Sequence, residues 1–204
     1  MATYITAFVT LFVVIDPVGL APIFIALTPG MSGAERRLIG LRSLVIAAIL
    51  LTLFGLAGEA ILSGIGISIS AFRIAGGLLL FLTALDMLFE RRTERREGQA
   101  GVETPSHDPS VFPLAMPLLA GPGALATMIL LVGEGQGAGH VVMVHLMMLA
   151  VLAIAMVLFL LATPLARALG RTGTMVVTRL LGMLLAALSV QFVIDGLRGS
   201  GLFG

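Results

Sequence analysis

The chain has 204 residues, of which 58% are hydrophobic and 11% are charged, and its mean hydropathy is +1.11. Because an ordinary soluble domain carries roughly 25% charged residues, this composition excludes a soluble globule and predicts an integral membrane protein in the lipid bilayer. The net charge of +1 argues neither for nor against a nucleic-acid partner, and no nucleic acid is expected. The lack of cysteine excludes disulfides and thiolate sites, and the scattered histidines predict no metal or other cofactor.

Six apolar stretches are long enough, or nearly so, to cross a bilayer core of ~30 Å, which takes about 20 helical residues. They lie at 4–28, 41–62, 67–89, 111–133, 141–166 and 174–197. The first is interrupted by DPVG and the fourth by AGPG. The N-terminal stretch has no basic region before it and is expected to be a retained membrane segment. The predicted fold class is therefore all-α integral membrane, with six transmembrane segments and a broken first and fourth helix.

The two halves of the chain resemble each other. The polar stretch 90–110 reads as a linker between a first three-helix repeat, 1–89, and a second, 111–204. The pattern R-x-x-G-x-L-L-x-x-L-[ST] starts at Arg73 and again at Arg179, and the two interruptions are offset by a similar distance, 105 against 106 residues. These matches predict an internal duplication. Three spans per half make the second half enter from the opposite face, which gives an inverted repeat, a plan common among secondary transporters.

Arginine placement predicts the orientation. If all six segments span, one side carries every loop arginine except Arg198, namely Arg36, Arg37, Arg42, Arg91, Arg92, Arg95, Arg96, Arg167 and Arg171. The positive-inside rule then makes the 90–110 linker cytoplasmic and leaves both termini outside, in a bacterial plasma (inner) membrane. If the two interrupted segments are instead re-entrant hairpins, the arginines divide eight against two. Segment length favours spanning, but both topologies stay open.

The interruptions contain residues that end one helix and start another. Proline lacks an N–H and clashes with the preceding turn, and aspartate before proline makes a good helix cap and first residue. Because irregular backbone at membrane depth needs protein or water partners, two matched breaks point to a shared polar cavity near the midplane. The predicted substrate-binding residues are Asp16, Pro17, Gly19, Gly121, Pro122, Gly123 and Ala124. The alternative is a pair of packing kinks.

The chemistry of these breaks favours a small zwitterion such as an amino acid. Free N–H groups at the starts of the half-helices suit a carboxylate, and Asp16 suits an ammonium group, a proton or a metal cation. A coupling ion, H⁺ or Na⁺, is left open.

Arg73 and Arg179 each lie about six residues inside a segment. A charged arginine inside the bilayer costs free energy, so its side chain usually faces protein or water. Small residues at helical spacing from both, such as Gly76 and Gly182, favour inward-pointing side chains. The functional interpretation is a gate or charge partner. The alternative is a structural contact with Glu59, Asp86 or backbone carbonyls, or snorkelling to the interface.

Three motifs occur in order: DPVGLAPIF at 16–24, GISISAFRIAGGLLLF at 66–81 and PLAMPLLAGPGALATMILL at 113–131. Together they resemble the MarC family of bacterial inner-membrane proteins, which includes the SnatA-type small neutral amino-acid transporters. This resemblance covers almost the whole chain. It implies six membrane segments and, for some members, movement of glycine, alanine or similar amino acids.

The expected function is therefore secondary transport of small neutral amino acids, and no enzyme is expected. An intramembrane aspartyl protease needs two carboxylates at one depth and a GxGD-type signature, and neither is visible in the sequence. The HExxH motif of a zinc protease and the G-x-S-x-G motif of a serine hydrolase are also absent from the sequence. A structural or stress-related membrane protein remains the other class. Whether the chain forms a homo-oligomer is left open, because small-residue faces pack equally well within one chain.

Overall fold

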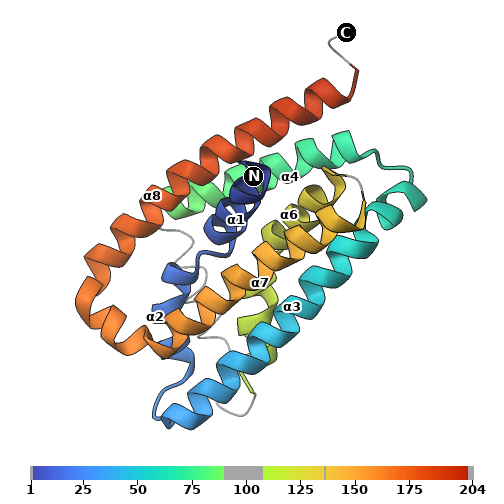
Figure 1. Cartoon of the computed structure of the whole chain (residues 1–204). Coiled ribbons are helices and arrows are strands. Elements are labelled where there is room, and N and C mark those ends of the chain that lie inside the picture. Colours follow the sequence, from blue (N-terminus) through green and yellow to red (C-terminus); the bar gives the residue numbers. More distant parts are fainter. Residues whose placement is uncertain (1, 90–107, 136, 202–204) are drawn as a thin grey trace.

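The structure is a computed structural model that describes residues 2–89, 108–135 and 137–201, so most of the predicted linker lies outside the described residues. The described part is 88% helix and contains no strand. Its elements, drawn in Figure 1, are α1 (Ala2–Ile15), α2 (Pro17–Leu27), α3 (Gly33–Gly64), α4 (Ile69–Leu88), η1 (Ser110–Leu119), α6 (Pro122–Gly133), α7 (Ala138–Leu160) and α8 (Ala162–Gly199).

In the part of the chain that the structure describes, five stretches of helix are long and apolar enough to cross a membrane, so the protein is an integral, multi-pass membrane protein. They are Tyr4–Leu27, Gly33–Gly64, Ile69–Leu88, Ala138–Leu160 and Thr172–Gly199. A sixth span is reached only if Ser110–Leu119 and Pro122–Gly133, which are bent by 56° relative to each other, count as one. The predictions of broken spanning helices, of an inverted repeat and of the 1–89 and 111–204 domains stay predictions.

Several helix boundaries differ from the predicted ones. α3 begins at Gly33 rather than 41, because Ser32 and Glu35 form a capping box in which each side chain accepts a hydrogen bond from the other residue's backbone N–H. The predicted continuous segment 141–166 is wrong at its end, since α7 stops at Leu160 and α8 begins at Ala162. α8 is itself broken at Gly170, whose φ of 61° leaves the helical region.

The short helices lie in the middle of the bundle. α4 and α8 run side by side, and α1 and α2 pack between this pair and α7 (Figure 1). α6 packs against α1, α3 and α4. Of an apolar 18-residue part of Tyr4–Leu27, 61% is buried, against 28% of the corresponding part of each of the other four long stretches. The first interruption therefore lies inside the bundle. At the second, Gly121 and Gly123 are partly buried and Pro122 is exposed.

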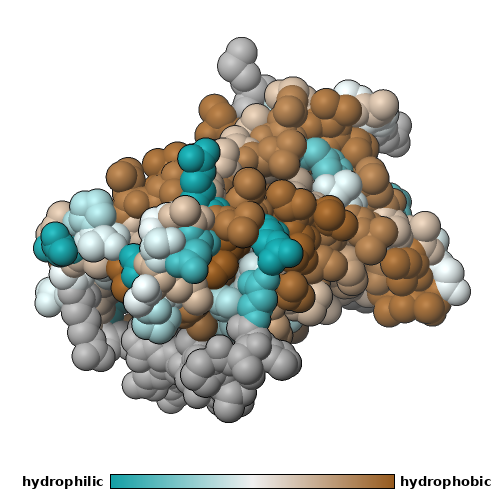
Figure 2. All heavy atoms as spheres, turned by 90° about the horizontal axis from the view of Figure 1, so that it is seen from below, coloured by the Kyte–Doolittle hydropathy of each residue, from teal (hydrophilic) through white to brown (hydrophobic). Residues whose placement is uncertain are grey.

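The outer faces of the long helices are apolar, and Figure 2 shows hydrophobic residues over most of one face of the molecule. On α3 the exposed side chains include Leu41, Val45, Ile49, Leu53 and Leu56, each at least half exposed. A soluble protein rarely exposes so large an apolar surface. Together with the helix lengths, this surface is the one that faces lipid.

Glycine brings α4 and α8 into close contact. A Cβ added at Gly77 would lie 2.8 Å from the carbonyl oxygen of Ser189 and 3.1 Å from the backbone nitrogen of Val193. A Cβ at Gly182 would lie 2.9 Å from the Cβ of Met87. Small residues at a membrane helix interface allow this close approach.

We expect Gly77→Ala to lower the thermal unfolding midpoint in detergent, because the new methyl group meets backbone that cannot turn aside. Overpacking of this kind costs about 1–3 kcal/mol. Gly139→Ala is the matched control, since a Cβ there meets nothing within 4 Å, and alanine is the better helix former. Equal midpoints for the two variants would contradict the described packing of α4 on α8.

Candidate functional site

A single residue separates α1 from α2. The backbone N–H of Asp16 donates to the carbonyl of Phe12 at 2.9 Å, and the Asp16 carbonyl accepts from the N–H of Leu20 at 3.1 Å. Its φ of 54° and ψ of 64° are left-handed, and no other non-glycine residue in the described part has a positive φ. Aspartate tolerates this conformation better than most residues. Asp16 thus ends one helix and caps the next.

The Asp16 side chain folds over the start of α2. Its Oδ1 accepts a hydrogen bond from the backbone N–H of Gly19 at 3.0 Å, and the residue is fully buried. A Cβ at Gly19 would collide with Oδ2 of Asp16, so the carboxylate requires glycine at this position. Pro17, buried at the first helical position, has no N–H to satisfy. A carboxylate here is also favoured by the helix dipole.

The second interruption has the same plan without the carboxylate. Gly121 is the cap residue of α6, with no side-chain hydrogen bond, and Pro122 is the first helical residue. A Cβ at Gly121 would lie 2.5 Å from the carbonyl oxygen of Pro117, so glycine is needed here too. The hydroxyl of Thr127 donates to the carbonyl of Gly123 at 2.8 Å. The first amides of α6 are therefore not covered by a side chain of the cap.

The two interruptions lie close to each other. A Cβ at Gly123 would lie 3.5 Å from Cγ1 of Val14, 3.3 Å from Cδ2 of Leu80 and 3.9 Å from Oγ1 of Thr83. Val14 belongs to the last turn of α1, just before Asp16. Ala124, the next predicted residue, is buried. The predicted residues of the second half thus pack against the end of α1 and the middle of α4.

One buried hydroxyl beside this region was missed by the sequence predictions. Thr10, on α1, is fully buried, and its Oγ1 has no hydrogen-bond partner within the described residues. A buried polar group without a partner is uncommon. A threonine within the apolar run that leads to Asp16 was the signal available in the sequence.

The two arginines occupy different environments. Arg73, on α4, is partly buried, and its Nε is buried with no hydrogen-bond partner in the described part of the chain. Arg179, on α8, is exposed, so the expectation of an inward side chain is wrong for this residue. It lies one position off the buried stripe of α8, which consists of Thr178, Gly182, Leu185, Ser189 and Phe192.

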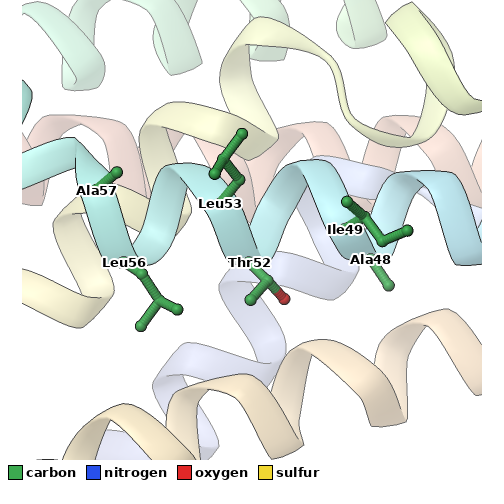
Figure 3. A pocket seen from close by; sticks show the side chains of 6 residues that line it. All are labelled: Ala48, Ile49, Thr52, Leu53, Leu56 and Ala57. Carbon is green, nitrogen blue, oxygen red and sulfur yellow. The ribbon is translucent and has the colours of Figure 1, made fainter.

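A hollow of about 500 Å³ opens on α3. Its lining side chains all come from this helix (Figure 3): Ala48, Ile49, Thr52, Leu53, Leu56 and Ala57. None of them is a predicted site residue, and Ile49, Leu53 and Leu56 are exposed on the lipid-facing surface. This hollow belongs to that surface.

The chain is similar to known membrane proteins over nearly its full length. Residues 1–200 match the model described as MarC family integral membrane protein. A UPF0056 membrane protein of Methanocaldococcus jannaschii is 37% identical, with 97% of each chain covered. The UPF0056 membrane proteins YvbG of Bacillus subtilis and YhcE of Escherichia coli are each 34% identical, covering 94% and 96% of this chain and 92% of each relative. No solved structure matches the chain.

Proposed function

Because the chain belongs to the MarC family of integral membrane proteins, we propose that it is a secondary transporter of small neutral amino acids such as glycine and alanine. The observation that carries this proposal is the contact between the Gly121–Gly123 interruption and the end of α1, next to the buried carboxylate of Asp16. Paired helix interruptions at one depth, joined by a buried charge, are typical of transporter substrate sites.

The asymmetry of the two interruptions suits a zwitterion. The start of α2 already carries a carboxylate, that of Asp16, so an added anion is disfavoured there. The start of α6 has no side-chain cap, and amides at a helix N-terminus bind carboxylates. In the proposed complex the substrate carboxylate therefore lies at Gly123 and Ala124 and its ammonium group lies toward Asp16. Side-chain size is limited by Leu80 and Val14, which contact Gly123.

An inverted repeat is part of the proposal, and the helix contacts support it. α1 packs against α7 as η1 packs against α3, and α2 packs against α7 and α8 as α6 packs against α3 and α4. Exchanging the halves therefore exchanges these contacts, as expected of two copies related by a twofold axis. The close contact of α4 with α8, the last helices of the two halves, agrees with the same axis.

Two helix ends support the same correspondence. At the end of α2, Nη2 of Arg36 donates to the carbonyl of Thr28 at 3.0 Å. At the end of α6, Nε2 of His140 lies 2.8 Å from the carbonyl oxygen of Leu131. In each half, a side chain from the first turn of the following long helix thus bonds a carbonyl at or near the end of the second short helix. Cationic or N–H groups are favoured there by the exposed carbonyls.

The proposed orientation places the arginine-rich end in the cytoplasm and both termini outside, in the plasma (inner) membrane. Arg36, Arg37, Arg42 and Arg167 lie at this end. The last part of the 90–110 stretch lies there too, because Nη1 of Arg42 is 2.6 Å from Oδ2 of Asp108. The buried state of Asp16 corresponds to a closed conformation, and rocking of one half against the other would open it.

The test is ligand binding followed by transport. Purified protein is heated with a panel of amino acids, and a ligand at 100 times its dissociation constant stabilises by roughly 2.7 kcal/mol. We expect stabilisation by glycine and alanine and uptake of the same compounds into proteoliposomes. A folded protein that neither is stabilised by nor transports any amino acid would favour the structural or stress-related class instead. Substrate turnover into a product would favour an enzyme.

A further inference from the structure

Four titratable side chains from four helices or helix ends lie near one another at the end of the bundle where α4 and α7 begin and α6 and α8 end. They are Arg73, Glu134, His140 and Asp195, here called the rim cluster. This end is opposite the arginine-rich end and faces outside in the proposed orientation. The cluster combines one cation with two carboxylates in a chain that has few charges.

The packing of α4 on α6 places Arg73 beside the last turn of α6. The two helices run antiparallel, since a Cβ at Gly76 would lie 3.0 Å from Cδ1 of Leu130 and one at Gly133 would lie 3.5 Å from Cδ1 of Ile69. Arg73 lies between Ile69 and Gly76 on α4 and so faces the Leu130–Gly133 turn. Glu134 caps that turn.

The other two members are fixed by α7 and α8. His140 is bonded to the carbonyl of Leu131 at 2.8 Å, which holds its ring against the end of α6. Asp195 precedes Gly196, where a Cβ would lie 2.7 Å from Cγ1 of Ile74. Asp195 therefore lies next to the turn of α4 that carries Arg73. The amide nitrogen Nε2 of Gln191 donates to Oδ1 of Asp195 at 2.9 Å.

The charges of this cluster are close but not directly paired. Among the described residues, no ion pair within 4.0 Å joins Arg73 to Glu134 or Asp195. The Nε of Arg73 is buried without a partner among them, and an unsatisfied buried donor is destabilising. Glu134 is exposed, but the protein around the end of α6 raises the pKa of its carboxyl group, an effect that Asp195 adds to and that Arg73 and His140 oppose. Arg73, Glu134 and Asp195 thus have no ion-pair partner within the part of the chain that the structure describes. A charged ligand could supply that partner.

We propose that the rim cluster is a second binding site for the transported zwitterion, in which Arg73 takes the carboxylate and Glu134 and Asp195 take the ammonium group. The inference rests on the proposed function and adds a recognition step at the outer rim. Arg73 lies about 10 Å along α4 from Leu80, which contacts Gly123 at the central interruption, at 1.5 Å per residue. The same two helices, α4 and α6, therefore line both sites.

The two carboxylates of this cluster have no acidic counterparts at the positions that the repeat equates with them. With the offset of 106 residues that relates Arg73 to Arg179, Glu134 corresponds to Thr28 and Asp195 to Phe89. Arg179 itself is exposed. The carboxylates are therefore not a requirement of the shared repeat packing, and recognition by this site acts on one side of the membrane only.

The test compares glycine with two analogues in uptake by cells that produce the protein. Glycinamide lacks the carboxylate and glycolate lacks the ammonium group. We expect Arg73→Gln to raise the KM for glycine roughly 10-fold or more, the loss of a charged hydrogen bond, with a smaller change in kcat. It should also weaken the preference for glycine over glycinamide as a competitor, because only the central interruption then recognises the carboxylate. Glu134→Gln combined with Asp195→Asn should weaken the preference over glycolate in the same way. Arg198→Gln, an exposed arginine at the same end, should keep wild-type values.

Different results separate this inference from the proposed function. Wild-type glycine transport with an unchanged KM and unchanged analogue preference in Arg73→Gln would overturn the rim site alone. A fall in kcat at constant KM in all rim variants would also overturn it, because a structural role acts that way. Absence of amino-acid transport by the wild type would overturn both. If Arg73→Gln does not fold, Arg73→Lys, which keeps the charge, should retain the preference for glycine over glycinamide.

Discussion

Replacement of Asp16 by asparagine is expected to abolish or strongly reduce transport of glycine and alanine while the protein stays folded. Asparagine caps a helix about as well as aspartate and tolerates a left-handed backbone, so the junction of α1 with α2 is kept. The variant loses only the charge that the proposed complex offers to the ammonium group. A hydrogen bond to a charged partner is worth about 1.5–3 kcal/mol, so binding should weaken roughly 10- to 100-fold. Radiolabelled uptake into proteoliposomes and ligand-dependent thermal stabilisation measure both effects.

Two further substitutions make this result specific. Glu59→Gln removes an exposed carboxylate from α3 and should leave uptake unchanged. Asp16→Ala removes the helix cap, which costs about 0.5–2 kcal/mol. It also places alanine in a left-handed conformation that alanine disfavours, so the unfolding midpoint of this variant should fall. Undiminished uptake by a well-folded Asp16→Asn protein would remove Asp16 from the substrate site.

Gly19→Ala is expected to be nearly as damaging, although it changes no charge. The added methyl group would occupy the space of the Asp16 carboxylate, so the side chain must leave its cap and the N–H of Gly19 loses its partner. We expect a loss of at least about 1–3 kcal/mol of stability, the cost of overpacking, together with loss of amino-acid binding. Chemical or thermal unfolding in detergent measures the first effect and ligand-dependent stabilisation the second.

A double-mutant cycle tests the physical cause. Asp16→Gly is compatible with the positive φ at this position and removes the group that the new methyl would meet. In that background Gly19→Ala should cost less stability than in the wild type, with an interaction energy of about 0.5–3 kcal/mol. Equal costs in the two backgrounds would mean that Gly19 is needed for a reason other than the Asp16 side chain.

The sequence predicted the interruptions because their signals are local. Aspartate followed by proline specifies a helix cap and first residue, and Gly-Pro-Gly specifies a break, whatever packs around them. The capping box at Ser32 and Glu35 was also readable, and would have set the start of α3. Membership of the MarC family was recognisable from three ordered motifs, and the family match over residues 1–200 confirms it.

The features that were missed depend on contacts between distant segments. Whether Arg179 faces in or out is set by a stripe of α8 that packs on α4, and a one-position shift reverses the outcome. The rim cluster joins side chains from α4, α6, α7 and α8, so no single window of sequence contains it. One hint was local: Glu134 follows an apolar run directly, at a helix end where the dipole disfavours a carboxylate.

The one-residue junction at Asp16 also limits how α2 can turn relative to α1. Both backbone groups of Asp16 are bonded, one to each helix, so reorientation with both helices intact passes through its φ and ψ alone. The corresponding stretch of the second half contains extended residues at Phe112 and Met116 and a further non-helical residue at Ala120. It therefore has several torsions to share the same motion. The junction of α1 with α2 therefore has one hinge residue, Asp16, whereas the second half spreads its non-helical torsions over Phe112, Met116 and Ala120.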